Sequence, residues 1–281
     1  MPANPVSGNE FPVGLRYGAA ISLQTQSTVA VPAGNSATVP YSGLPFVGAN
    51  AFNLTIPDPR TIVHPGDDRV MATDFLPTLD SVTATIEVSR YDMTLNALLT
   101  GVKVSTELDI TMMPWATDAQ GDEPTVGLFF YQQSLNAATK VRNWHSYIMP
   151  ACRCIPKPAG MSASQTNVTY NVVVNPVAAQ LWGTALTDGT NGAIEQGVVE
   201  MHSEGQPWIA AWIGAAAGAT KYPFATNKQA KSIVKINCWH ITTAGVVTNV
   251  TASGATFETS GPTITANIPA SSIIVALYEL A

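Results

Sequence analysis

The residues with the greatest chemical potential in this chain are its four histidines and three cysteines. His64, His145, His202 and His240 are far apart, and none lies at metal-ligand spacing from another histidine or a cysteine. The pair Cys152 and Cys154 is too closely spaced for the common zinc or thioredoxin-like sites, and Cys238 is distant. We therefore predict no metal site, no cofactor and no disulfide framework. The cysteines and His240 are interpreted as core residues.

The acidic residues offer two further candidate sites. Asp67, Asp68 and Asp74 lack the ligand spacing and closing glutamate of a calcium loop, so we interpret them as a solvated acidic turn. Glu107 and Asp109 could act as the carboxylate pair of a glycosidase, but no aromatic platform for a sugar accompanies them. The chain also lacks a G-x-S-x-G elbow, a Walker loop and a G-x-G-x-x-G turn. No catalytic residue is predicted, and the protein is not expected to be an enzyme.

The elements that would position such side chains are clearest between Ser81 and Met113. Residues 82–88 alternate between apolar and polar side chains, which predicts a strand with one buried face. A short helix follows over about 92–100, with Asp92 as its N-cap and Gly101 at its end. Alternation then resumes over 102–112 and predicts one long strand. Its polar face carries Lys103, Ser105, Glu107, Asp109 and Thr111.

Composition indicates a β-rich protein that associates with other subunits. Only 11% of the 281 residues are charged, whereas roughly 25% is usual, and 46% are hydrophobic. The 20 prolines and 21 glycines leave little room for long helices. A surface so poor in charge suggests that neighbouring subunits cover much of it. The net charge of −6 argues against a sequence-independent grip on DNA.

We expect no targeting segment in this sequence. Its first residues have neither the basic start nor the apolar core of a signal peptide, and no apolar run is long enough to cross a membrane. The three Asn-x-Thr sequons, at Asn53, Asn167 and Asn249, are interpreted as chance products of a threonine-rich chain. We expect a protein made in the cytoplasm.

Three regions are expected along the chain, all in an all-β antiparallel sandwich or barrel with one flanking helix. Residues 1–55 read as an extended N-terminal arm that a neighbour orders. Residues 56–200 form the main β domain, with a turn-rich start over Ile56–Pro77 and an irregular end over Asn175–Pro207. Residues 201–281 form a further β region that either completes the main sandwich or makes a small outer domain.

Charge is distributed in blocks that could form contacts between subunits. Twelve acids and four bases lie between Asp58 and Glu123, whereas residues 140–157 carry four bases and no acid. Acidic and basic surfaces on opposite sides of a subunit would allow head-to-tail stacking. Folding could equally intermix these blocks so that no patch exists. The candidate interface residues are Asp67, Asp68, Arg69, Asp118, Asp122, Glu123, Arg142, Arg153 and Lys157.

The order of these elements resembles the major tail tube proteins of long-tailed bacteriophages. The resemblance covers residues 81–175: the strand, the leucine-rich helix ending in Gly101, an acidic loop, Gly127-Leu-Phe-Phe-Tyr, the strand closing on Met149-Pro-Ala-Cys-Arg-Cys-Ile-Pro, and Asn167-Val-Thr-Tyr-Asn-Val-Val-Val. It implies a virion protein that forms hexameric rings, stacked as a hollow tube through which DNA passes without specific binding. The implied partners are tape-measure, tail terminator and baseplate proteins, with no membrane.

The resemblance also suggests which residues face the lumen, where an acidic wall would let a polyanion pass without sticking. The lumen-facing candidates are Ser105, Glu107, Asp109 and Thr111, with Lys103 as an unexplained exception. Two other classes of protein remain open. A capsid-decoration or baseplate protein would form closed rings that do not stack, and a carbohydrate-binding or hydrolytic β-sandwich would be monomeric with an aromatic groove.

Overall fold

The computed structural model of the chain describes residues 10–27, 29–58, 60–66, 69–76, 81–102, 105–107, 110–112, 124–136, 139–156, 167–174, 197–215, 219–224, 233–250, 256–258 and 263–280. These residues form antiparallel β-sheets with one short helix, so the predicted all-β fold is confirmed. Within this described part, no helix has the length and hydropathy needed to cross a membrane.

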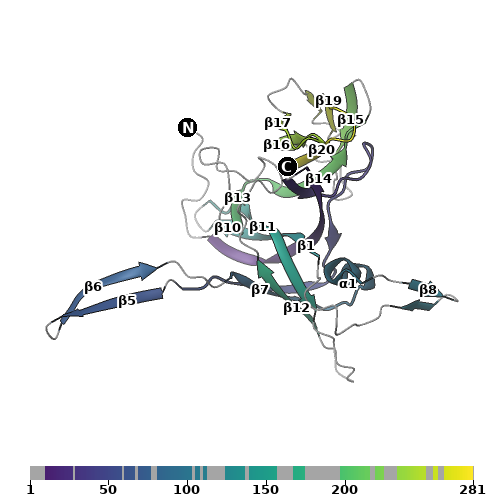
Figure 1. Ribbon diagram of the computed structural model, residues 1–281. Helices are drawn as coiled ribbons and strands as arrows, with labels where there is room; N and C mark the ends of the chain where they lie inside the picture. Colours follow the sequence, from purple (N-terminus) through teal and green to yellow (C-terminus); the bar gives the residue numbers. More distant parts are fainter. Residues whose placement is uncertain are drawn as a thin grey trace.

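The largest sheet contains nine strands and forms the body of the molecule (Figure 1). Its main path runs β2-β1-β10-β11-β12-β7-β4, while β3 pairs with β1 and β13 pairs with β11. The strands are β1 (Glu10–Gln26), β2 (Val29–Pro32), β3 (Leu44–Pro45), β4 (Ala49–Thr55), β7 (Thr83–Val88), β10 (Val126–Asn136), β11 (Arg142–Pro156), β12 (Val168–Val174) and β13 (Val199–Ser203).

One face of this sheet encloses an apolar core together with the helix. Alternate residues of β12 are buried and pair with β7 in a register that matches Tyr170 to Ile86. The helix α1 (Met93–Thr100) contributes Leu95 and Leu99, which are 2% and 0% exposed. This burial explains why the apolar stripe of a helix only eight residues long is kept in place, since so short a helix is not stable alone.

The ends of α1 are fixed by the two residues that the sequence indicates. The Asp92 side chain accepts hydrogen bonds from the backbone N–H groups of Thr94 and Leu95 at 2.8 and 3.2 Å. Gly101 ends the helix in the left-handed region at φ 72°, where its N–H bonds to the carbonyl of Ala97. The predicted helix and both of its caps are therefore confirmed.

A second layer, built from the C-terminal strands, packs on the other face of the large sheet (Figure 1). It holds two sheets, ordered β14-β20-β16-β17 and β15-β19-β18. The strands are β14 (Gln206–Ile213), β15 (Ala219–Pro223), β16 (Ile233–Ile241), β17 (Val247–Asn249), β18 (Thr256–Glu258), β19 (Thr263–Asn267) and β20 (Ile273–Leu280).

One continuous core joins the two layers. It includes Ile21, Phe129 and Ile148 from the large sheet and Trp208 and Trp212 from β14. The side-chain amide of Gln206 also donates a 2.7 Å hydrogen bond to the hydroxyl of Tyr131 across the layers. The described C-terminal strands are thus packed against the main sheet through a shared core.

The prediction of an extended N-terminal arm is wrong for residues 10–55. β1 pairs with β10 over most of its length, and its residues Ala19 and Ala20 are completely buried. Further along, Tyr41 exchanges two backbone hydrogen bonds with Ala211 of β14. The low charge and frequent prolines of this region, which suggested an arm, instead belong to a strand at the centre of the fold and to connections that join the two layers.

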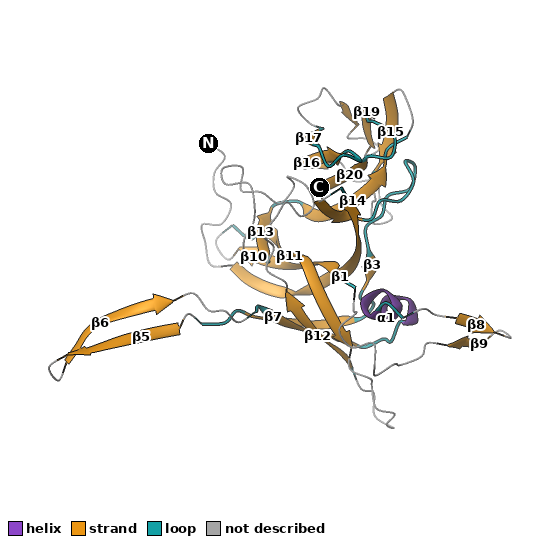
Figure 2. Cartoon of the chain, in the orientation of Figure 1, coloured by secondary structure: helices purple, strands orange, loops and turns teal. Residues whose placement is uncertain are grey.

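Two hairpins project from opposite sides of the body (Figure 2). The first pairs β5 (Arg60–Gly66) with β6 (Arg69–Leu76), and the second pairs β8 (Ser105–Glu107) with β9 (Ile110–Met112). The turn-rich interpretation of Ile56–Pro77 is therefore wrong, because most of this region is a hairpin. The prediction of one long strand over 102–112 is also wrong, because Glu107 pairs with Ile110 and the chain reverses between them.

Candidate functional site

The pairing of β11 with β13 places two histidines directly opposite each other. His145 is the register partner of His202, and Tyr147 is the partner of Glu200. Since residues two apart share one face of a strand, and directly paired residues share a face of the sheet, all four occupy the same face. Two of them come from a segment whose predicted irregularity is wrong, because β13 lies within Asn175–Pro207.

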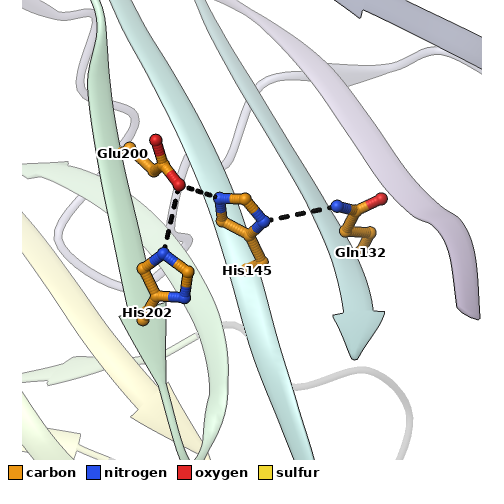
Figure 3. Close-up of polar contacts among 4 residues, drawn as sticks. All are labelled: Gln132, His145, Glu200 and His202. Carbon is orange, nitrogen blue, oxygen red and sulfur yellow. Dashed lines mark hydrogen bonds and ion pairs between the residues drawn. The ribbon is translucent and has the colours of Figure 1, made fainter. Parts of the chain in front are cut away.

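The three ionisable side chains form a compact group centred on the Glu200 carboxylate (Figure 3). Glu200 Oε1 lies 2.6 Å from Nε2 of His145 and 3.1 Å from Nε2 of His202. The two imidazole rings stack with centroids 4.3 Å apart and an interplanar angle of 15°. One ligand atom from each residue lies within 4.8 Å of the other two, which is close enough for one small ion to contact all three.

The ring nitrogens of His145 have different surroundings. Nδ1 lies 3.3 Å from the side-chain amide of Gln132, its register partner on β10. Nε2 is buried and lies 2.6 Å from Glu200 Oε1, although no aligned hydrogen bond joins these two atoms. Gln132 therefore holds one side of the ring, while the other side is directed towards the group.

The three side chains of the group differ in how far they are exposed to solvent. The His145 side chain is 15% exposed, whereas those of His202 and Glu200 are 30% and 51% exposed. His145 and Gln132 line a cleft of about 440 Å³ beside β4, and His202 lines a second cleft of about 700 Å³ beside β16 and β20. The group therefore contributes one histidine to the lining of each cleft.

Tyr147 borders the same group. Its ring lies 4.7 Å from that of His145, and burial together with the negative charge of Glu200 raises the pKa of its hydroxyl above the ordinary value. Tyr147 therefore remains protonated at neutral pH. It can donate a hydrogen bond near the group but does not supply an anionic ligand.

No family model, curated protein or solved structure matches this chain.

The lumen-facing candidates do not lie along one strand. Ser105 and Glu107 belong to β8 and stand opposite Met112 and Ile110, whereas Thr111 belongs to β9 and stands opposite Thr106. Asp109 lies outside the described residues. The reversal between β8 and β9 breaks the single polar row that strict alternation predicts, although three of the four candidates stay within one hairpin.

Most of the candidate interface residues lie outside the described residues, namely Asp67, Asp68, Asp118, Asp122, Glu123 and Lys157. Arg69 begins β6. Arg142 is an exposed residue at the start of β11, where its guanidinium donates a 3.5 Å hydrogen bond to the side-chain carbonyl of Gln133. Arg153 is exposed near the other end of β11. Among the described residues, Arg142 and Arg153 lie near opposite ends of β11.

The three cysteines are core residues, and none of them belongs to the group of His145, Glu200 and His202. Each is completely buried as a free thiol, and burial raises the pKa of all three. They are therefore poor nucleophiles and poor metal ligands at neutral pH. His240 is half-buried on β16, away from the group on β11 and β13.

The group of His145, Glu200 and His202 is not predicted from the sequence, because the two histidines lie far apart along the chain. One signal was present: Glu200-x-His202 has the two-residue spacing that places both side chains on one face of a strand. What the sequence could not provide was the pairing of that strand with β11, across more than fifty residues.

Proposed function

We propose that this protein is a structural subunit that assembles with copies of itself into stacked rings enclosing a hollow tube, as a phage tail tube protein does. The main support is the pair of hairpins that project from a well-packed body (Figure 2). β5 pairs only with β6, and β8 pairs only with β9, among the described strands. Strands that leave the fold in this way are available to neighbouring subunits.

The longer hairpin, β5–β6, has the greater reach. Its eight-residue strand β6 spans roughly 26 Å at about 3.3 Å per residue, which is long enough to reach an adjacent subunit. An isolated two-stranded hairpin is only marginally stable in water. We expect packing against a second copy of the chain to stabilise β5 and β6 in the assembled state.

The surface beside the hairpins also favours association. Ile56, which leads into β5, is 67% exposed, and Tyr91, which precedes α1, is 41% exposed. Charged side chains on the surface help to keep a protein monomeric, and they make up only 11% of this chain. Contacts between subunits would remove these apolar side chains from water.

The resemblance to tail tube proteins supplies the finer parts of the proposal. It implies six copies per ring, a location in the virion tail, and tape-measure, terminator and baseplate proteins as partners. On this proposal the β8–β9 hairpin, which carries the lumen-facing candidates Ser105, Glu107 and Thr111, contributes to the lumen wall. A wall with net negative charge would not retain passing DNA.

The test is negative-stain electron microscopy of the purified protein at rising concentration, together with analytical ultracentrifugation. We expect hollow tubes of uniform bore from the natural chain. Replacement of residues 60–76 by a short Gly-Ser linker should abolish tubes while the thermal unfolding transition persists. Val246→Ser, an exposed change in the C-terminal layer, serves as the control and should leave the tubes intact.

Other outcomes would contradict this proposal in different ways. Closed rings that never stack would favour a capsid-decoration or baseplate protein. Monomers at every concentration would favour a binding module. Tubes that form equally well without residues 60–76 would remove the hairpin from the assembly contacts.

A further inference from the structure

We propose that His145, Glu200 and His202 bind a divalent transition-metal ion of the zinc class. Nε2 of each histidine and one carboxylate oxygen of Glu200 are the proposed ligands. This inference is independent of the proposed tube, because all three residues come from one chain. Their position on two directly paired strands means that folding alone assembles the site.

The donor atoms select the class of metal. Two imidazole nitrogens and one carboxylate suit zinc and its transition-metal neighbours, whereas magnesium and calcium prefer sites built entirely from oxygen. The same set of two histidines and one glutamate occurs in zinc sites that keep a coordination position open. The chemistry of the three side chains thus points to zinc rather than to an alkaline-earth ion.

The distances require only small side-chain adjustments. Zinc–ligand bonds of about 2.0–2.2 Å place tetrahedral ligand atoms about 3.3 Å apart. The Glu200 oxygen already lies 2.6 and 3.1 Å from the two Nε2 atoms, and all three ligand atoms fall within 4.8 Å. The two stacked rings must move relative to each other so that both Nε2 atoms can bind one ion. His202 has room to do so, because it is 30% exposed on β13.

Gln132 can accommodate both forms of the His145 ring. Without metal, its amide N–H can donate to Nδ1 while the proton of the neutral ring resides on Nε2. Metal binding needs the lone pair of Nε2, so the proton must reside on Nδ1 instead. Rotation of the Gln132 amide by half a turn then presents its carbonyl oxygen as the acceptor, which is the usual second partner of a metal-bound histidine.

Three protein ligands leave a fourth position on the ion. Glu200 and His202 are the exposed members of the group, so this position is directed towards solvent and the neighbouring clefts. We assign it to water, or to a single donor atom from a molecule that enters either cleft. A metal ion held in this way can exchange its fourth ligand without disturbing the fold.

The test uses the full chain, treated with EDTA and then freed of the chelator. Isothermal titration with Zn²⁺ alone should show one ion bound per chain. Titration with Co²⁺ should give the visible absorption typical of four-coordinate cobalt. Glu200→Gln and His202→Ala should each weaken Zn²⁺ binding by more than about 100-fold, which exceeds the usual effect of residues outside the first coordination sphere.

Glu204→Gln provides the matched control. Glu204 is also exposed and lies just beyond β13, but it is not part of the group, so Zn²⁺ affinity should not change. The proposal is overturned if the natural chain binds no Zn²⁺. It is also overturned if both ligand variants, folded by circular dichroism, bind as tightly as the natural chain. Since binding is measured by titration, a failure to form tubes leaves this test intact.

Discussion

The ring of Phe130 on β10 lies directly over the backbone of Gly18 on β1, in the space that a Cβ atom would occupy. The two residues are register partners in the large sheet. From this position the ring stacks on Phe46 and Phe52, with centroids 5.5 and 4.5 Å apart. The glycine therefore allows β10 to present an aromatic side chain to the strands that fold over it.

Gly18→Ala should destabilise the protein by about 1–3 kcal/mol, because the new methyl group forces Phe130 out of its packed position. Chemical denaturation monitored by circular dichroism measures this change. Combining Gly18→Ala with Phe130→Leu should recover part of the loss, since the two changes are coupled through one contact. Strictly additive effects of the two substitutions would contradict this account of the packing.

The parts of the fold that local signals determine could be predicted from the sequence. The helix between Asp92 and Gly101 has a cap at each end and an apolar stripe, all within ten residues. The strand β12 shows complete alternation over its seven residues. In both cases the information lies in neighbouring residues, so tertiary context confirms what local chemistry already favours.

The parts that depend on distant pairing could not be predicted. The sequence predicts an arm where β1 lies, because no nearby residue indicates that β10 is its partner more than one hundred residues away. The sequence predicts one strand where β8 and β9 form a hairpin, because apolar and polar residues continue to alternate over 102–112 and no strong turn signal interrupts them. The group of His145, Glu200 and His202 could not be predicted for the same reason, since only the pairing of β11 with β13 brings its residues together.

Asp92→Ala should lower stability by about 1 kcal/mol, because the N–H groups of Thr94 and Leu95 lose their shared acceptor. The free energy of unfolding is again the measurement. Thr94→Ala is the matched control, as it changes an exposed residue in the same helical turn and keeps its backbone N–H. An equal loss in both variants would show that the cap does not explain the effect.

Stability should fall on acidification through a window set partly by His240. Burial lowers the pKa of this imidazole below its ordinary value of 6.5, so the unfolded chain binds the proton more readily than the folded one. The contribution of His240 to the free energy of unfolding is therefore present above pH 6.5 and is lost as the pH falls towards the lowered pKa. His240→Gln should reduce this slope in denaturation curves recorded across the window. An unchanged slope would assign the acid sensitivity to other groups.

Gln132 offers the most discriminating test of how the His145 ring is held, and this prediction rests on the proposed metal site. Gln132→Leu removes the partner of Nδ1 and should weaken Zn²⁺ binding about 10- to 100-fold, as loss of an outer-shell acceptor usually does. Gln132→Glu supplies a carboxylate that accepts a hydrogen bond from Nδ1–H without rotating, so affinity should be retained or increased. Isothermal titration of the three chains gives the comparison. A weakening by the same factor in both variants would mean that Gln132 acts through packing and not as a hydrogen-bond acceptor.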